Sequence, residues 1–193
     1  SKRTVDIEFE TPFGWKELFG LAYRTDFDLK NHMEKSGEDL QYFDPFTNEK
    51  FIPHVVEPTF GLTRTVLMVL LSSYHEEIVS DKEGEGSTRV VLKLNPKIAP
   101  YKVAVLPLSN KLTEATQKVW QQVKDSYNTD FDVSGSIGKR YRRQDEIGTP
   151  YCITVDFDTA TDNKVTIRER DSMKQDRISL DQVQSYLREK LGF

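Results

Sequence analysis

The first part of the chain has the alternating pattern of antiparallel strands. Residues 5–9 alternate apolar and polar side chains, and a second strand-like run covers residues 15–22. Two further runs, 40–43 and 50–56, are joined by the turn-rich residues 44–48, which include proline and asparagine. Alternation with a period of two, interrupted by turn residues, is typical of strands that follow one another in a sheet. The pattern predicts an antiparallel meander.

The period changes after this meander. Residues 62–74 place apolar side chains mostly three or four positions apart, which predicts a buried helix packed on the sheet. Residues 80–89 are polar, rich in glycine and almost without apolar side chains. Because such a segment offers nothing to a hydrophobic core, it predicts an exposed loop near a joint between two domains.

The second part of the chain alternates strand-like and helix-like segments. Residues 102–107 form a short apolar run of the kind that is buried on both faces of a sheet. The segments that follow are, in order, a helix, a short strand, a basic helix, two strands and a closing helix: 112–127, 131–133, 137–147, 151–157, 164–168 and 180–191. This order predicts a layered α/β domain with a mainly parallel or mixed sheet. We divide the chain into domains at 1–89 and 90–193.

The composition excludes several classes of protein. Of the 193 residues, 37% are hydrophobic and 30% charged, and no apolar run reaches the roughly 18 to 20 residues of a membrane-spanning helix. The single cysteine, Cys152, excludes an internal disulfide framework, and the scattered histidines lack the spacing of a zinc site. The net charge of −4 argues against indiscriminate binding of polyanions, so a nucleic-acid role would need a local basic patch.

The start of the sequence shows neither a signal peptide nor an initiator methionine. It enters a strand-like run directly after Ser-Lys-Arg, without a basic region followed by an apolar stretch and a small-residue cleavage site. We therefore expect a cytoplasmic protein, and a chain that begins in the middle of a longer one.

One short segment combines features of a nucleotide site. Residues 57–64 read as the end of a strand, a turn and the start of a helix. Gly61 would let the backbone approach a bound phosphate or ribose, and Arg64 could cover an adenine or reach a phosphate. Taken alone, the same residues also fit an ordinary turn with proline and glycine, followed by a solvated arginine.

Four long segments resemble glycyl-tRNA synthetases of the single-polypeptide, dimeric type. They read PFGWKELFGLAYRTDFDLKNH, IPHVVEPTFGLTR, IAPYKVAVLPL and GSIGKRYRRQDEIGTPYCITVDFDT, and the resemblance runs along essentially the whole chain. It implies the last strands and the motif 3 helix of a class II catalytic domain, followed by an anticodon-binding domain with a mixed five-stranded sheet. The implied enzyme is a cytoplasmic homodimer that joins glycine to tRNA(Gly), using ATP with Mg²⁺ and no zinc, and that binds neither membranes nor DNA.

The resemblance also implies roles for the residues around the turn. Glu57 and Arg64 correspond to catalytic positions of motif 3. The expected glycine-binding residues are Glu57, Pro58, Thr59, Phe60 and Gly61. The expected ATP-binding residues are Glu17, Leu18, Gly61, Leu62, Thr63 and Arg64. Since glycine has no side chain to recognise, a carboxylate such as that of Glu57 suits the recognition of its ammonium group.

Simpler interpretations exist for some of these residues. Glu57 could be a capping carboxylate near the following helix, and Glu17 could lie on a solvated strand face. Arg24, Asp26 and Asp28 are expected to form an ion-pair network, and we assign them no catalytic role.

Class II synthetases also use motifs that are missing from this chain. An arginine of motif 2 holds the α-phosphate of ATP, and motif 1 forms the dimer interface; neither motif is present. Because that arginine stabilises charge that develops during adenylation, we expect these 193 residues alone not to aminoacylate.

Residues 139–143 place four cations and a tyrosine in five positions. Guanidinium groups can bind phosphates in two-pronged fashion, and Tyr141 could stack on an unpaired base. The alternative is a solvated helix paired with Asp145 and Glu146. This segment resembles the anticodon-binding domain shared by glycyl-, threonyl-, prolyl- and histidyl-tRNA synthetases. The expected tRNA-binding residues, some of which must instead pair with nearby acids, are Lys139, Arg140, Arg142, Arg143, Arg168 and Arg170.

Two other functions fit the same sequence. The first is that of a synthetase-derived accessory protein that binds RNA or DNA without catalysis. Such proteins usually lose the substrate-site residues, whereas Glu57, Thr59, Gly61 and Arg64 are all present here. The second is that of an autonomous RNA-binding module. If the chain binds ATP, this second function is disfavoured.

Overall fold

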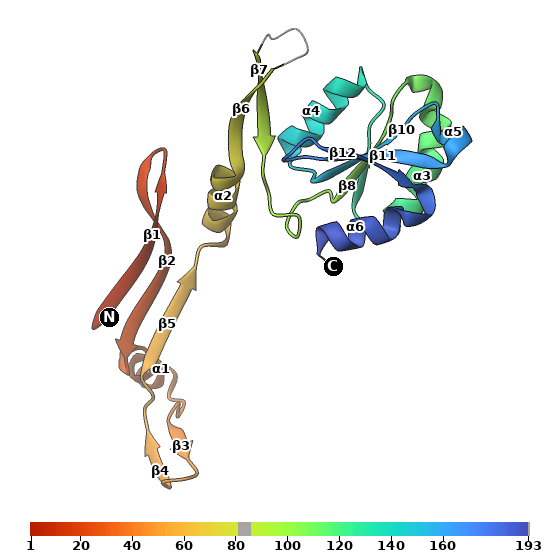
Figure 1. The fold of residues 1–193 in the computed structure, drawn as a ribbon. Coiled ribbons are helices and arrows are strands. Elements are labelled where there is room, and N and C mark those ends of the chain that lie inside the picture. The colour runs from red at the N-terminus through yellow and green to blue at the C-terminus, as the bar shows by residue number, and fades with distance from the viewer. Residues whose placement is uncertain (81–85, 193) are drawn as a thin grey trace. The chain divides into compact units, whose positions relative to one another are not determined.

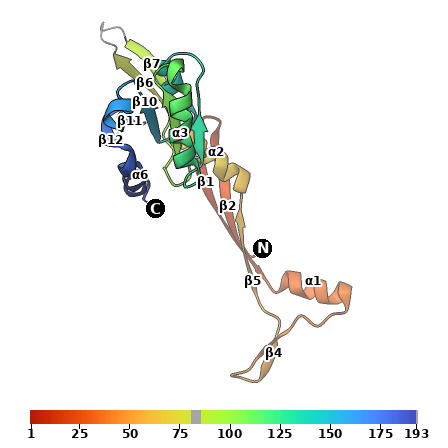
Figure 2. The same ribbon diagram turned by 90° about the vertical axis from the view of Figure 1, so that its right-hand side faces the viewer.

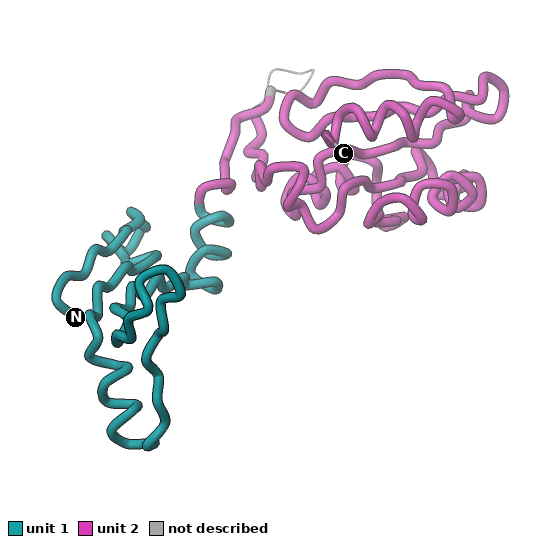
Figure 3. The backbone as a smooth tube through the Cα atoms, turned by 90° about the horizontal axis from the view of Figure 1, so that it is seen from below, with its two compact units in different colours: residues 1–71 teal, residues 72–193 magenta. Residues whose placement is uncertain are grey.

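The computed structural model describes residues 1–80 and 86–192, and the chain divides into two compact units (Figure 3). The first unit covers Ser1–Leu71 and the second covers Ser72–Phe193. The domain boundary expected at residues 89 and 90 falls inside a strand of the second unit, so the two units meet earlier in the chain than the sequence pattern indicates.

The first unit is built on a three-stranded antiparallel sheet in the order β1-β2-β5 (Figure 1). Its strands are β1 (Arg3–Thr11), β2 (Gly14–Thr25) and β5 (Val55–Phe60). The hairpin of β3 (Tyr42–Asp44) and β4 (Glu49–Phe51) forms a separate two-stranded sheet. The expected meander is therefore only partly present, because the third strand of the main sheet begins after the hairpin.

Helix α1 (Phe27–Ser36) was not expected from the sequence. None of its residues is buried, so it lacks the apolar stripe from which a helix is usually recognised. The helix ends at Gly37, whose φ of 75° is left-handed and whose N–H donates to the carbonyl of Met33. The glycine cap therefore marks the end of this helix, and no hydrophobic face marks its length.

Helix α2 (Leu62–Ser73) agrees with the expected helix, but it is not the buried helix that the apolar pattern suggested. Met68 is its only buried residue, and Val66 and Leu70 are 53% and 42% exposed. Among residues 1–71, all of which the structure describes, only Thr11 and Met68 are buried. A three-stranded sheet alone offers no second layer against which this helix could cover its apolar side chains.

The second unit begins with a hairpin of β6 (Tyr74–Ser80) and β7 (Gly86–Leu92). The exposed loop expected for residues 80–89 is wrong for its last part, because residues 86–89 belong to β7 and the side chain of Arg89 is fully buried. Residues 81–85 lie outside the described residues. The hairpin was missed because its glycine-rich, polar sequence gives a loop signal, whereas Arg89 is buried through ion pairs and not through apolar contacts.

A mixed five-stranded sheet forms the centre of the second unit, in the order β12-β11-β10-β8-β9 (Figure 1). Its strands are β8 (Val103–Pro107), β9 (Thr129–Phe131), β10 (Tyr151–Val155), β11 (Lys164–Glu169) and β12 (Gln175–Ser179). Strand β8 is parallel to both β9 and β10, while β11 is antiparallel to β10 and β12. The layered α/β fold with a mixed five-stranded sheet is confirmed.

Helices cover both faces of this sheet (Figures 1 and 2). Helices α3 (Thr113–Lys124) and α6 (Val183–Leu191) pack on the face that carries Val103 and Val105. Helix α4 (Ile137–Ile147) packs on the opposite face, against Ala104 and Leu106. All five residues of β8 are buried, as expected for a strand covered on both sides.

The remaining helical segments are short. They are a 3₁₀ turn before α3, helix α5, and a 3₁₀ turn before α6: Asn110–Leu112, Thr159–Asp162 and Leu180–Gln182. In residues 1–80 and 86–192, no helix is long and apolar enough to cross a membrane.

Candidate functional site

The turn from β5 into α2 places its residues beside β2. Antiparallel pairing sets Thr59 opposite Gly20 and Glu57 opposite Ala22. Because directly paired residues point to the same side of a sheet, these four residues share one face. The same register brings Asp6 of β1 opposite Gly20. The face therefore combines a carboxylate and a hydroxyl from β5 with two very small residues from β2.

Gly61 closes the turn against β2. Its N–H donates to the carbonyl of Leu18 at 3.3 Å, and a Cβ at this position would lie 3.1 Å from the same oxygen. Such an approach is tighter than side chains normally tolerate, so glycine allows the helix to start this close to the strand. The backbone carbonyl of Leu18 thus lies at the turn.

Arg64 reaches back from the first turn of α2 to the same strand. Its guanidinium Nη1 donates to the carbonyl of Glu17 at 2.9 Å and lies 3.8 Å from the Glu17 carboxylate. The side chains are 55% and 49% exposed, which leaves the other guanidinium N–H groups open to solvent. The structure therefore brings together Glu17, Leu18, Gly61 and Arg64, four of the residues expected at ATP.

Glu57 does not cap the following helix. Its carboxylate lies 3.2 Å from the guanidinium of Arg24, which also donates to both carboxylate oxygens of Asp28. The bond from Arg24 holds the pKa of Asp28 below its usual range, and the same bond raises the pKa of Arg24. The expected ion-pair network is confirmed for Arg24 and Asp28, while Asp26 pairs with Lys30 at 2.7 Å instead.

The other expected residues of this site are less closely engaged. Pro58 lies opposite Leu21, and the Phe60 ring meets Phe19 edge-on with centroids 5.1 Å apart. Leu62 is 77% exposed. The side chain of Thr63 is also exposed.

Sequence reasoning missed the part played by Gly20 and Asp6. A Cβ on Gly20 would lie 3.6 Å from the Glu17 carboxylate and 3.7 Å from that of Asp6. Both contacts depend on the register between strands, which no local sequence pattern reports. The only signal was the glycine itself, inside a run that otherwise reads as a strand.

In the second unit, the expected basic helix is present as α4. It begins after Ser136, whose backbone is extended, and ends at Gly148, which has a left-handed φ of 83°. The N–H of Gly148 donates to the last turn of the helix, as in common glycine caps. A Cβ on Gly148 would lie 2.9 Å from the carbonyl of Leu92 and 2.9 Å from the side chain of Leu94.

Arg140 points inward from α4 and is 1% exposed. Its guanidinium donates to the carbonyls of Val133 at 2.6 Å and Gly135 at 2.7 Å, and also to the carbonyl of Pro107 and the side chain of Asn110. These bonds join the start of the helix to the ends of neighbouring segments. Arg140 therefore holds the fold together and is not presented to a partner.

Asp145 is the shared acid of a second buried group. Arg168 donates to its two oxygens at 2.8 and 3.1 Å, and Arg89 donates to it at 2.9 Å. Arg89 also bonds Glu77 of β6 at 2.8 Å and the carbonyl of Arg170. The hairpin, α4 and β11 are thus joined through one carboxylate, which is itself fully buried.

Arg170 is buried as well. It donates to the carbonyls of Gly148 and Leu94, both at 2.8 Å, and to the carboxylate of Asp171 at 2.7 Å. Of the six residues expected to bind tRNA, the three buried ones are Arg140, Arg168 and Arg170. Each of them donates to protein oxygens, although the buried Nε–H of Arg140 has no partner among the described residues, and the structure does not bring them to the surface with the others.

The remaining three cations face solvent on α4. Lys139, Arg142 and Arg143 line an open depression of about 470 Å³ together with Ser136, Gly138 and Glu146. Arg143 is held by Asp132 at 2.5 Å, and Arg142 lies 3.8 Å from Asp145. The side chains of Arg142 and Arg143 are 37% and 41% exposed, so both keep N–H groups for a further partner.

Tyr141 does not offer its ring to a base. Its hydroxyl pairs with that of Thr154 at 2.6 Å, and the guanidinium of Arg168 lies over the ring at 4.8 Å. Burial raises the pKa of Tyr141. The tyrosine packs against the core under α4, which removes it from the exposed basic depression.

The described residues contain no group of three or more histidine, cysteine, aspartate or glutamate side chains arranged to hold a metal ion.

Comparison with known proteins gives one family match and several similar relatives. Residues 102–190 match the family described as the anticodon binding domain. Across all 193 residues the chain is 58% identical to the glycine–tRNA ligase of Caldanaerobacter subterraneus subsp. tengcongensis, covering 41% of that protein. It is 56% identical over 191 residues to the enzyme of the same name from Clostridium acetobutylicum, covering 99% of this chain and 40% of the relative. Along its whole length the chain is similar to glycine–tRNA ligases.

A third glycine–tRNA ligase, from Staphylococcus haemolyticus, is 54% identical over the full chain and is again covered to 41% of its length. The chain therefore spans about two fifths of the length of these glycine–tRNA ligases. The matched anticodon-binding residues begin at Lys102 and end in α6, so they contain the five-stranded sheet and α4. The β6–β7 hairpin lies outside that match, although Arg89 is buried against residues inside it.

Proposed function

We propose that this chain is part of a glycine–tRNA ligase, which activates glycine with ATP and transfers it to tRNA(Gly). The observation that carries the proposal is the junction of β5 and α2, where Glu57 and Thr59 face two very small residues and Arg64 lies against Glu17. This junction occurs in a chain that is 58% identical to a glycine–tRNA ligase over its whole length.

ATP would be bound around Gly61 and Arg64. The exposed guanidinium of Arg64 can cover an adenine ring or reach a phosphate, and its bond to the Glu17 carbonyl fixes its direction. Gly61 allows a ligand to approach the backbone closely. Leu18, Leu62 and Thr63 complete the proposed ATP surface, with Mg²⁺ accompanying the nucleotide as part of the substrate complex.

Glycine would be bound on the face shared by Glu57 and Thr59. The Glu57 carboxylate would accept hydrogen bonds from the glycine ammonium, with Arg24 and Asp28 fixing its position. Specificity for glycine requires that a Cβ be excluded, and a pocket excludes one extra carbon by only about 1 to 3 kcal/mol unless the walls are rigid. Pro58 and Phe60 point to the opposite face of β5, where pairing with Leu21 and ring contact with Phe19 hold the strand against β2 and so stiffen it from behind.

tRNA would be contacted through Lys139, Arg142 and Arg143. These three cations keep N–H groups in solvent and form the open depression on α4. Arg140, Arg168 and Arg170 would support this surface from within, because each already donates to protein oxygens. Phosphate contacts from lysine and arginine give affinity, while the positions of the bases give specificity.

The full-length enzyme would act as a cytoplasmic homodimer without binding DNA or membranes, as the family resemblance implies. Motifs 1 and 2 are absent from these 193 residues, so we propose that this chain alone does not aminoacylate. A non-catalytic accessory protein is not favoured, since the expected substrate-site residues are present and the matched relatives are glycine–tRNA ligases.

Exchange of pyrophosphate into ATP tests the proposal in the full-length protein. Glycine should drive the exchange, and Arg64→Ala should slow it at subsaturating ATP by about tenfold or more, because one cationic contact to the nucleotide contributes about 1.5 to 3 kcal/mol. Lys16→Ala, on the exposed neighbouring strand position, is the matched control and should stay within about twofold of the wild type. The proposal would be contradicted by an exchange rate that does not depend on glycine. It would also be contradicted by an Arg64→Ala rate equal to that of the control.

A further inference from the structure

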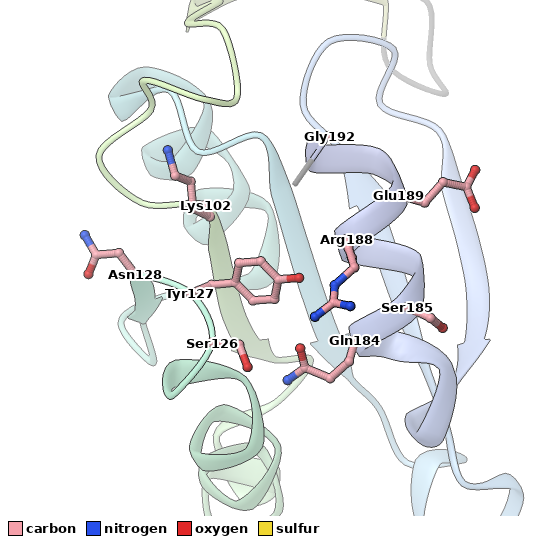
Figure 4. Close-up of a pocket in the computed structure, with 9 residues that line it drawn as sticks. All are labelled: Lys102, Ser126, Tyr127, Asn128, Gln184, Ser185, Arg188, Glu189 and Gly192. Carbon is pink, nitrogen blue, oxygen red and sulfur yellow. The ribbon is translucent and has the colours of Figure 1, made fainter.

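A second hollow lies at the end of the five-stranded sheet that is opposite to the start of α4. It has a volume of about 790 Å³ and lies between α6 and the turn that follows α3 (Figure 4). Its lining residues are Lys102, Ser126, Tyr127, Asn128, Gln184, Ser185, Arg188, Glu189 and Gly192. Strands β8 and β9 are parallel, Lys102 precedes β8, and α4 follows β9. The hollow therefore lies at the amino-terminal ends of these strands, whereas α4 starts beyond their carboxy-terminal ends.

Arg188 supplies the charge of this hollow. In the part of the chain that the structure describes, its guanidinium makes no hydrogen bond or ion pair. Figure 4 shows Arg188, Tyr127 and Gln184 pointing toward one another, whereas Glu189 points away from them. The nearest acid on the helix is thus turned away from the Arg188 guanidinium.

Two lining side chains already donate to backbone carbonyls of residues outside the lining. Lys102 donates from Nζ to the carbonyls of Pro96, Lys97 and Ala99, at 2.8, 2.9 and 2.9 Å. Gln184 donates to the carbonyl of Gln122 at 2.9 Å.

At the ends of α3 and α6 near the hollow, backbone carbonyls accept hydrogen bonds from backbone N–H groups. The carbonyl of Val123 accepts bonds from the N–H groups of Ser126 and Tyr127, and that of Arg188 accepts one from Gly192. Among the lining residues that the structure describes, the Arg188 guanidinium and two hydroxyls are donors without a protein partner. Within the described residues, the hydroxyls of Ser126 and Tyr127 have no hydrogen-bond partner of their own.

Tyr127 adds a flat surface beside the cation. The residue is half-buried and packs against the core cluster that α3 and α6 share, so its ring is held in place. A fixed aromatic ring beside a guanidinium can stack on a nucleobase, and the guanidinium can bind a phosphate at the same time. The volume lies within the range of about 300 to 1,000 Å³ that is usual for small-ligand sites.

We propose that this hollow binds the phosphate group of a nucleotide, with Arg188 and the Tyr127 hydroxyl as donors and the tyrosine ring beside the base. The nucleotide can be free or part of an RNA strand, since both present the same phosphate and base. This site is separate from the basic depression on α4 and does not depend on it.

Nuclear magnetic resonance of the isotopically labelled 193-residue chain gives a local readout. AMP, adenosine, inorganic phosphate and a short single-stranded oligoribonucleotide would each be titrated to about 10 mM, which detects dissociation constants weaker than 1 mM. We expect AMP to shift the signals of Arg188, Ser126 and Tyr127. Adenosine should leave them unchanged, and inorganic phosphate should bind more weakly than AMP. Stronger binding of the oligonucleotide than of AMP would assign the site to RNA, and the reverse would assign it to free nucleotides.

Substitutions then test the donors. Arg188→Gln should weaken AMP binding about tenfold, and Arg188→Lys should retain part of the affinity because it keeps the charge. Lys190→Gln removes one charge from the same turn outside the hollow and should change the affinity less than about twofold. The Arg64→Ala background separates these shifts from any binding in the first unit.

Three results would overturn the proposal. They are equal affinity for adenosine and AMP, equal affinity of Arg188→Gln and Lys190→Gln, and the absence of any shift around Arg188 at the highest AMP concentration. Because tRNA binding by α4 is measured separately, the proposal for one site can be contradicted while the proposal for the other stands.

Discussion

Four arginines of the second unit are almost completely buried. Arg89, Arg140, Arg168 and Arg170 are 0%, 1%, 4% and 2% exposed. Arginine is rarely buried to this extent unless its charge is paired. Here the partners are Asp145, Asp171 and several backbone carbonyls. The residue type alone could not separate these arginines from RNA-binding ones, because both kinds donate to anionic or carbonyl oxygens and differ only in the source of that oxygen.

At the residue scale, Glu57 gives a direct test of glycine recognition. Glu57→Gln in the full-length enzyme should raise the KM for glycine by about tenfold or more and change the KM for ATP far less, since the amide loses the charge that faces the ammonium. The pair with Arg24 would also weaken, so Asp28→Asn serves as the matched control that disturbs the same arginine from its other side. Steady-state pyrophosphate exchange measures both constants. Equal rises for the two substrates would indicate a structural glutamate.

At the element scale, the elements that could be predicted had either a clear apolar run or clear signals at their ends. Strand β8 and helix α4 were predicted within a residue or so, because one is continuously apolar and the other has a clear start and a glycine stop. Helix α1 and strand β12 were not predicted. Helix α1 buries no side chain, and β12 reads Gln-Asp-Arg-Ile-Ser, with a single apolar residue. Elements that gain their stability from caps and sheet hydrogen bonds leave little trace in a hydrophobic pattern.

Helix α4 is the element on which tRNA affinity should depend. Neutralising Arg142 and Arg143 together should weaken binding of tRNA(Gly) to the 193-residue chain and flatten the plot of log affinity against log salt, by about one slope unit or less for each phosphate that is no longer neutralised. Neutralising Lys118 and Lys124 of α3 removes the same charge from the other face of the sheet and should leave the slope nearly unchanged. Filter binding across a salt series measures both. Identical slopes for the two double variants would show that the α4 cations are only solvated.

At the scale of the whole molecule, the two units differ in how much core they contain. In residues 1–71 only Thr11 and Met68 are buried, whereas the second unit has a continuous cluster on one face of its sheet and a smaller one on the other. Apolar residues exposed in the first unit include Val5, Ile7, Val56 and Phe60. Such a surface needs cover, and the chain spans only about 41% of the length of its relatives, so we expect that cover to come from the rest of the full-length protein.

The second unit should therefore fold alone, provided that it keeps the hairpin. We expect residues 72–193 to unfold cooperatively in urea. Arg89→Met should lower the free energy of unfolding of residues 72–193 by about 3 kcal/mol, since it removes one partner from a buried ion pair. Lys93→Met is the matched control, because Lys93 also pairs with Glu77 but remains 32% exposed, and its loss should cost less than about 1 kcal/mol. Far-ultraviolet circular dichroism follows both transitions. Equal midpoints for the two variants would show that the buried pair is not important for stability.

The glycine that ends α4 has a consequence for any library of variants made in this helix. Gly148 combines a left-handed φ of 83° with two atoms only 2.9 Å from any added Cβ, so a library that varies this position would consist mostly of misfolded members. The outward positions of the helix, such as 139, 142 and 143, carry no such restriction. On the proposed RNA surface, the outward positions of the helix can therefore be varied, whereas the glycine at its end cannot.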